Sequence, residues 1–270
     1  MKPTSKSEGS SEMKQRGSPA AKRRPLGSEI VSLPRALSKL GFCSRSQAEL
    51  LIREGKVRVN GQLARFATQR VHLLDDQITV QNAKVAAPDH VYLMLSKPRG
   101  LITTVSDERG RATVFKCFEG ANLPRVVPVG RLDQASEGLL LFTNDTKWAN
   151  EMTSPTAHLP KIYHVQVAGI PTEAQVNQFR SGVESEGEVL RCSEIKIIRH
   201  GEKNSWLELT LHEGKNRHIR RMLAGLGIEV LRLIRIAVGP LKLGDLPKGQ
   251  FRKLTETEVR ALTPINQGLS

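Results

Sequence analysis

The sequence has few cysteines, no long apolar segment and none of the common cofactor motifs. Its cysteines, Cys43, Cys117 and Cys192, are scattered over 270 residues, and no two have the spacing of metal ligands or of a disulfide framework. They are typical of reduced thiols in a cytoplasmic protein. No apolar region follows the basic N-terminus, as it would in a secretory signal. The histidines form no zinc motif, and neither a Walker loop nor a dinucleotide fingerprint occurs. We therefore expect chemistry that needs no metal and no cofactor.

Acidic residues are outnumbered, which points to a polyanionic partner. The chain has 41 Lys and Arg against 27 Asp and Glu, a net charge of +14 and a pI near 10.0. A charge of this size repels itself unless a polyanion shares it, so nucleic acid is the first partner to consider. An anionic membrane surface is the alternative, but no membrane span and no basic amphipathic anchor helix is visible. Nothing in the sequence indicates more than a monomer.

The first 30 residues are a basic arm rich in Ser, Gly, Pro, Lys and Arg, and we expect them to be disordered. Residues 31–81 then predict a small helix-helix-strand module. Leu33, Leu37 and Leu40 recur at helical spacing up to Gly41, and Ser44 with Gln47 has the pattern of a capping box for a second helix. A short strand, KVRV, leads to the tight turn Asn60-Gly61.

The stretch RALSKLGFCSRSQAELLIREGKVRVNG resembles the alpha-L RNA-binding module, which was first recognised in a ribosomal protein of the small subunit. The pattern leaves four cations on its outside, and we expect them to contact RNA phosphates rather than bases. These are Arg45, Arg53, Lys56 and Arg58. The alternative is that these four side chains only face solvent and bind nothing.

Residues 82–90 are small and polar and are expected to be a linker, followed by a catalytic domain at 91–262 and a C-terminal tail at 263–270. Several segments of this domain either alternate apolar and polar residues or form short apolar runs, as strands do. They include YLML, GLLLF, KIYHVQV and WLELTLH. We predict an α+β fold with a mixed, mainly antiparallel sheet. In KIYHVQV, Tyr163 shares a face with Val165 and Val167 and should point to the core or to a pocket wall.

One carboxylate, Asp133, lies in the connection GRLDQASE between two buried strand segments. A scaffold that fixes both ends of a loop while its side chain stays accessible is a common setting for a catalytic group. Of the neighbouring carboxylates, Glu137 is expected to order the loop and Asp145 to be a turn residue.

A helix is predicted at NRHIRRMLAGLG, residues 216–227, with Asn216 as its cap and Gly227 at its end. Its apolar stripe leaves Arg220 at the border, from which it can lean into a cleft. Arg217 and Arg221 lie nearly opposite the stripe and should face solvent or a polyanion.

The motifs SKPRG, GRLDQASEGLLLFTND, KIYHVQV, EGKNRHIRRM and LPKGQFRKLT occur in this order, and the domain that carries them is similar to the RNA pseudouridine synthases of the RsuA/RluB/RluF branch. The resemblance covers about residues 33–260. It implies that a uridine of ribosomal RNA leaves its stack, is detached from its ribose, turned and rejoined through a ring carbon. It also implies ribosome biogenesis as the process and a cytoplasmic location.

The resemblance assigns Asp133 as the reacting carboxylate, nucleophile or proton acceptor at the sugar, with Arg220 as its ion-pair partner. Tyr163 would pack against the uracil. The residues implied to hold RNA in this domain are Arg131, Lys215, Arg217 and Arg221. His218 stands where relatives often carry Gln, so substrate contacts are expected to differ there.

Two other functions fit the same residues. The chain could be a noncatalytic RNA-binding factor in ribosome assembly, which would bind RNA and leave its uridines unchanged. It could also be an RNA glycosidase, but that reaction needs a second well-placed acid. The stretch RGRATVF favours large-subunit over small-subunit ribosomal RNA as the substrate.

Overall fold

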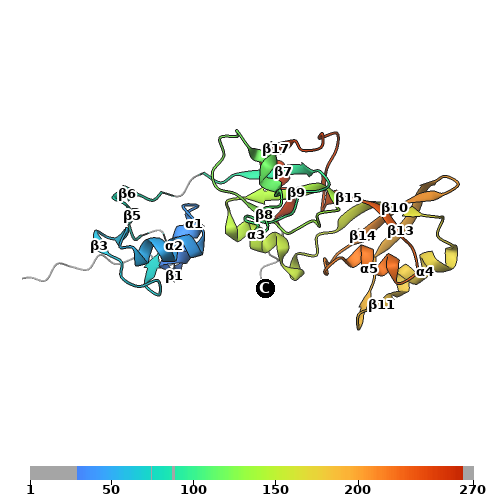
Figure 1. Ribbon diagram of the computed structural model, residues 1–270, viewed down its shortest axis with the longest axis horizontal. Coiled ribbons are helices and arrows are strands. Elements are labelled where there is room, and N and C mark those ends of the chain that lie inside the picture. The colour runs from blue at the N-terminus through green and yellow to red at the C-terminus, as the bar shows by residue number, and fades with distance from the viewer. Residues whose placement is uncertain (1–28, 74, 87–88, 264–270) are drawn as a thin grey trace, which may run out of the picture.

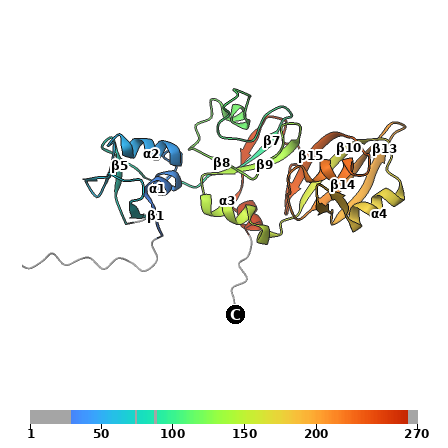
Figure 2. The ribbon, with the colours of Figure 1, turned by 60° about the horizontal axis from the view of Figure 1, so that its bottom comes forward.

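A computed structural model describes residues 29–73, 75–86 and 89–263 of the chain. Of the basic arm predicted at residues 1–30, residues up to 28 lie outside the described residues, and Ile30 instead belongs to a strand. Of the tail predicted at 263–270, the residues from 264 lie outside the described residues. Figures 1 and 2 show a small N-terminal module followed by a larger domain built on one long sheet. Within the described residues, no helix has the length and apolar character needed to cross a membrane.

The N-terminal module has the predicted two helices and a small sheet. Helices α1 (Leu33–Lys39) and α2 (Arg45–Arg53) pack on strands arranged in the order β3-β2-β5-β6. The capping box is present, since the Ser44 hydroxyl accepts from the Gln47 nitrogen and the Gln47 side chain accepts from the Ser44 nitrogen. The six strands of the module are β1 (Ile30–Ser32), β2 (Val57–Val59), β3 (Gln62–Leu63), β4 (Arg70–His72), β5 (Ile78–Val80) and β6 (Ala83–Lys84).

The Asn60-Gly61 turn forms as predicted, with both residues at positive φ, 51° and 81°. The module also continues beyond residue 81. Strand β6 pairs with β5, and Val85 is buried in the core of the module. Strand β6 could not be predicted from the pattern of apolar residues, because it has two residues and both side chains are exposed.

The larger domain is a mixed α+β fold around a nine-stranded sheet, as predicted. Its strands run in the order β13-β14-β10-β15-β9-β7-β17, with β16 on β15 and β8 on β9. Every neighbouring pair is antiparallel except β9 with β15. The strands are β7 (Tyr92–Lys97), β8 (Val127–Val129), β9 (Glu137–Thr143), β10 (Lys161–Ala168), β13 (Glu194–His200), β14 (Asn204–Leu211), β15 (Val230–Val238), β16 (Leu241–Lys242) and β17 (Phe251–Lys253).

The sheet has two halves with separate cores. One half carries α4 (Glu173–Ser181), α5 (His218–Ala224) and the hairpin β11 (Val183–Ser185) and β12 (Glu188–Leu190), and its core includes the alternating leucines of β14. The other half carries α3 (Thr146–Thr153), α6 (Glu256–Leu262) and the 3-10 turns η1 (Val114–Phe118) and η2 (Pro155–Ala157). All seven residues of β9 are buried, which explains its continuous apolar sequence.

The halves meet where β9 lies parallel to β15 for only two residue pairs, Ile234 with Glu137 and Arg235 with Gly138. Gly138 has φ 101°, and an added Cβ would overlap the backbone of Arg235. Only glycine permits this approach, which positions the loop before β9 next to strands β10 and β15.

One predicted helix boundary near the site is wrong, and one turn residue has a further role. The helix expected at 216–227 spans only His218–Ala224, and its N-cap is Arg217, at φ 47°, rather than Asn216. Asp145 is not merely a turn residue, because its carboxylate accepts from the nitrogens of Lys147 and Trp148 and so caps α3.

Helix α6 is attached by Glu258, whose carboxylate accepts from both Nη1 and Nη2 of Arg252 at 2.8 and 2.6 Å and from the Thr255 nitrogen at 2.9 Å. The hydrogen bond from Arg252 is the main cause that lowers the pKa of Glu258 to about 2. The pKa of this carboxylate is lower in the folded than in the unfolded chain. Its stabilising contribution is therefore complete above the unfolded pKa and is lost as the pH falls toward 2.

Glu258→Gln is expected to lower the free energy of unfolding by on the order of 1 kcal/mol at pH 7, since the pair is partly exposed. Chemical denaturation at pH 7 and at pH 3 measures the effect, which should be smaller at pH 3. Glu256→Gln is the matched control, because the Glu256 side chain is 89% exposed. An equal loss in both variants would contradict this role of Glu258.

Candidate active site

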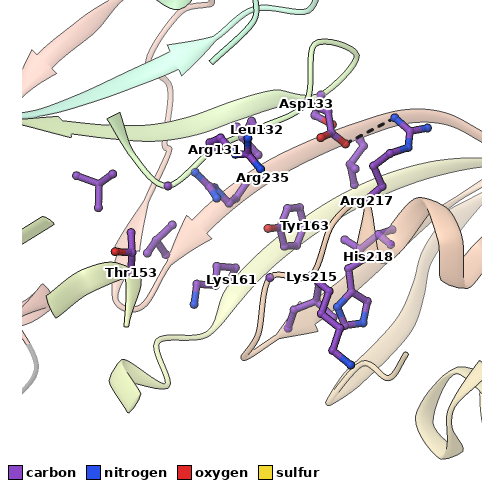
Figure 3. A pocket seen from close by; sticks show the side chains of 18 of the residues that line it. Arg131, Leu132, Asp133, Thr153, Lys161, Tyr163, Lys215, Arg217, His218 and Arg235 are labelled. Carbon is purple, nitrogen blue, oxygen red and sulfur yellow. Dashed lines mark ion pairs between the residues drawn. The ribbon is translucent and has the colours of Figure 1, made fainter. Parts of the chain in front are cut away.

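A cavity of about 260 Å³ opens at the junction of the two halves of the sheet. Its walls come from the loop before β9, the end of α3, the strands β10, β14 and β15, and the segment that leads into α5 (Figure 3). Three residues predicted to be catalytic, Asp133, Tyr163 and Arg220, line this one cavity although 30 and 57 positions separate them along the chain.

Asp133 lies in the loop between β8 and β9 with 37% of its side chain exposed. The loop turns at Gly130, which has φ 77°. It closes with a hydrogen bond from the backbone nitrogen of Ser136 to the backbone carbonyl oxygen of Asp133. Gln134 exchanges two hydrogen bonds with Gly100 of the KPRG turn, through its backbone oxygen and its side-chain amide. The backbone around Asp133 is therefore fixed while the carboxylate faces the cavity.

Lys97, at the end of β7, is fully buried beneath this loop. Its Nζ donates to the carbonyl oxygens of Ser136 at 2.9 Å, Pro98 at 3.1 Å and Asp133 at 3.2 Å. Burial lowers the pKa of Lys97 to about 8, and the nearby charge of Asp133 opposes this shift. The sequence gives no local sign of this contact, because the carbonyls of Asp133 and Ser136 that accept from Lys97 lie in a loop far along the chain.

Lys97→Met is expected to lower turnover about 100-fold, because the loop that carries Asp133 loses its buried donor and small misplacements of a reacting group are costly. Lys116→Met, at an exposed lysine nearby, is the control. Steady-state rates at pH 7 measure the effect, and equal rates in the two variants would contradict a positioning role.

The same ammonium makes wild-type turnover sensitive to pH. Above about pH 8 the buried amine loses one of its N–H donors, so turnover should fall. Stability should not fall with it, because a lysine whose pKa is lowered by folding opposes folding while charged, and this cost disappears between pH 8 and the unfolded pKa.

Tyr163 and Arg235 are paired neighbours on β10 and β15, and both line the cavity. Tyr163 packs against the cores of both halves, so its ring is held while one side lines the cavity. Arg235 is only 7% exposed, and its Nε donates to the Leu139 oxygen at 2.7 Å. The sequence did not mark Arg235, since an arginine within a strand usually faces solvent.

Asp133 was predicted to form an ion pair with Arg220, but the structure pairs it with another arginine. The cation paired with Asp133 is Arg217, whose Nη1 lies 4.0 Å from Oδ2 (Figure 3). Arg220 instead donates from Nη2 to the Ala135 oxygen at 3.2 Å, and its buried Nε has no partner among the described residues. Burial is the main cause that lowers the pKa of Arg220, and the charge of Asp133 opposes this shift. Both arginines thus face the loop that carries Asp133.

The predicted outward position of Arg221 is wrong. Its side chain is 13% exposed and is held by the β11–β12 hairpin, donating to the Ser185 oxygen at 2.7 Å and to Glu188 at 3.0 Å. Arg221 does lie opposite the apolar stripe of α5, as the helical spacing predicted. The β11–β12 hairpin, however, covers that side of the helix. We therefore no longer expect Arg221 to contact RNA.

The other predicted RNA contacts lie at the surface, but several have protein partners. Arg131 is exposed at the edge of the cavity. Lys215 lines the cavity with 33% of its side chain exposed, and its Nζ lies 3.9 Å from Glu213 and donates to the Val189 oxygen at 3.4 Å. On the N-terminal module the four predicted cations are exposed, although Lys56 pairs with Glu54 and Arg58 donates to the Gly61 oxygen. Two further arginines of this module, which were not predicted to contact RNA, are also exposed: Arg65 and Arg70, of which Arg70 donates to the Ile30 oxygen.

His218 lines the cavity but is 4% exposed, and its Nε2 contacts the Arg191 oxygen at 3.0 Å. A carbonyl partner requires a proton on Nε2, and burial, the main cause, lowers the pKa of the ring. The neutral ring therefore leaves Nδ1 as an acceptor rather than a donor.

Comparison with known proteins identifies both parts of the chain. A family model described as RNA pseudouridylate synthase matches residues 91–225, and an S4 domain model matches residues 31–78. A Bacillus subtilis protein named ribosomal large subunit pseudouridine synthase B is 38% identical over 236 residues, which cover 86% of this chain and 96% of that protein. An Aquifex aeolicus protein named uncharacterized RNA pseudouridine synthase is 38% identical over 234 residues, 86% of this chain and 93% of the relative. A crystal structure of a pseudouridylate synthase has a TM-score of 0.61 at 28% identity and covers 86% of this chain and 99% of its own.

Proposed function

This chain belongs to the RNA pseudouridylate synthase family and is an isomerase of RNA, and from that premise we propose that it converts a specific uridine of large-subunit ribosomal RNA to pseudouridine. The name of the Bacillus subtilis relative supports the large subunit. The observation that carries the proposal is the single cavity shared by Asp133, Tyr163 and Arg220.

The reaction breaks the bond between the sugar C1′ and the uracil N1 and forms a bond from C1′ to the ring carbon C5. The proton on C5 leaves, and N1 gains one. The reacting atoms are shielded in stacked RNA, so the uridine must turn out of the helix into a pocket. The cavity at the junction of the halves is the pocket in this proposal, and it is lined by strands β10, β14 and β15, the Asp133 loop and the segment before α5.

Asp133 is the reacting group in this proposal, as nucleophile or as proton acceptor at the sugar. Either role needs the carboxylate to face the sugar of a uridine in the cavity. Arg217, 4.0 Å away, and Arg220, which donates to the Ala135 oxygen of the same loop, place positive charge beside the reacting carboxylate. Arg220 therefore acts together with Arg217 rather than as the sole partner.

Tyr163 is the residue against which the uracil packs in this proposal. Its ring is anchored in both cores and borders the cavity opposite Asp133, so a base between them would have its sugar directed to the carboxylate. The Tyr163 hydroxyl is then available for the proton that leaves C5.

The exposed cations hold the RNA backbone. Arg131 and Lys215 at the cavity and Arg45, Arg53, Lys56 and Arg58 on the N-terminal module would contact phosphates, which gives affinity that falls steeply with salt and little sequence choice. The substrate would be either free ribosomal RNA or the RNA of an immature ribosomal subunit. The protein would act as a monomer.

Ribosomal RNA that lacks modifications and carries tritium at C5 of its uridines tests the proposal. Incubation with wild-type protein should release tritium from large-subunit RNA and not from small-subunit RNA. Binding without release, on naked RNA and on immature subunits alike, would favour the noncatalytic assembly factor. Free uracil as the product would indicate a glycosidase.

A further inference from the structure

A second hollow adjoins the cavity, and Gly130, Arg131 and Thr153 line both. We call it the outer groove. The Thr103–Val105 segment borders it on one side and helix α3 on the other. Its remaining lining residues are Val127, Pro128, Thr146, Ala149 and Asn150. A polymer that places one unit in the cavity has therefore a continuous hollow in which to place the next.

The lining suits a nucleobase, which has apolar faces and a polar edge. Val127, Pro128 and Ala149 offer half-buried apolar surface. Asn150 is exposed, and no hydrogen bond to its carboxamide occurs among the described residues. This side chain offers a donor and an acceptor together, the combination that pairs with a base edge.

The walls of the outer groove are rigid. The Thr103 hydroxyl donates to the Leu132 oxygen at 2.7 Å and accepts from the Leu132 nitrogen at 3.3 Å, so this wall is joined to the loop that carries Asp133. On the other side α3 is capped by Asp145 and anchored by buried Trp148. A ligand there would keep a fixed distance from the cavity.

The charge at the shared boundary fits a phosphate. Arg131 is exposed and lines both hollows. Among the described residues, no carboxylate lines the outer groove. A phosphate that links a base in the cavity to a base in the groove would lie beside Arg131.

We propose that the outer groove binds the nucleotide that directly adjoins the target uridine in the RNA, with Asn150 contacting the edge of its base and Arg131 the phosphate between the two. This inference rests on the proposed function, since it requires a uridine in the cavity. When that uridine turns out of its stack, its neighbour loses a stacking partner, and the apolar floor of the groove replaces it. The choice of target would then depend in part on the neighbouring base.

The first experiment uses an RNA fragment around the mapped uridine and versions in which the nucleotide on either side is abasic. An abasic neighbour on one side should raise the KM of the wild-type protein about 10-fold. Asn150→Ala should raise KM to a similar extent with intact RNA and have no further effect with that abasic RNA. Asn122→Ala, at an exposed asparagine that lines neither hollow, should match wild type.

The second experiment does not depend on turnover. RNA with 4-thiouridine at each neighbouring position is crosslinked by light to the Asp133→Asn variant, and the modified peptide is identified. Crosslinks on α3 or on the segment 103–105 support the groove. Crosslinks elsewhere, or abasic neighbours that leave KM unchanged, would overturn it. Absence of tritium release from every RNA with the wild-type protein would overturn the proposed function, and this inference with it.

Discussion

Asp133→Asn is expected to reduce tritium release to background, a loss of about 10⁴-fold or more, while the protein still folds and binds RNA. The amide has the shape of the carboxylate but can neither attack the sugar nor accept a proton from it. Among the residues that the structure describes, the Asp133 side chain makes no hydrogen bond, and its ion pair with Arg217 spans 4.0 Å, so its charge contributes little to the fold.

The measurements are tritium release, thermal unfolding and RNA affinity at fixed salt. Asp245→Asn removes the same charge from an exposed loop residue outside the cavity and should leave all three unchanged. Turnover by Asp133→Asn within 10-fold of wild type would exclude Asp133 as the reacting group.

Gly138→Ala is expected to be the most damaging change of a single methyl group in the chain. The added Cβ would overlap the carbonyl oxygen of Arg235 and lie 2.8 Å from its nitrogen. Backbone strain at φ 101° and the forced separation of β9 from β15 should together cost about 2–5 kcal/mol of stability. Turnover should fall even in the protein that remains folded, because Tyr163 and the Asp133 loop are attached to opposite sides of this contact.

Gly169→Ala separates the two causes. Gly169 also has a positive φ, 73°, but an added Cβ there would meet no atom within 4 Å. It should therefore show the strain alone, about 1 kcal/mol by comparison. Urea denaturation of both variants gives the difference, and equal losses would mean that the close approach of β9 and β15 is not needed.

The sequence predicted local structure well wherever neighbouring residues determine it. The capping box of Ser44 and Gln47, the Asn60-Gly61 turn and the alternating face of Tyr163 depend on residues a few positions apart, and each forms as expected. The convergence of Asp133, Tyr163 and Arg220 came from resemblance to a family, since spacing along a chain does not reveal a shared cavity.

Two of the wrong or missing predictions arise from contact between distant segments, and a third from a local change of the backbone. Arg221 was expected to be outside because nothing near it in the sequence announces the hairpin that covers α5. Lys97 is buried because loop carbonyls about 40 positions later accept from it. The identity of the cation beside Asp133 depended on the first residues of α5, where Arg217 takes a left-handed conformation instead of continuing a helix from Asn216.

The two residue pairs that join β9 to β15 also bear on how the protein is made. Each half of the sheet has its own core, but the contact between Gly138 and Arg235 joins positions 97 apart in the chain. Closing a loop of that length is slow compared with forming hairpins. As the chain leaves the ribosome, the first half has Asp133 long before the strand that faces it has been synthesised. A nascent chain that ends before β15 would therefore contain the reacting carboxylate but no pocket, and the enzyme is expected to become active only after nearly all of it has been translated.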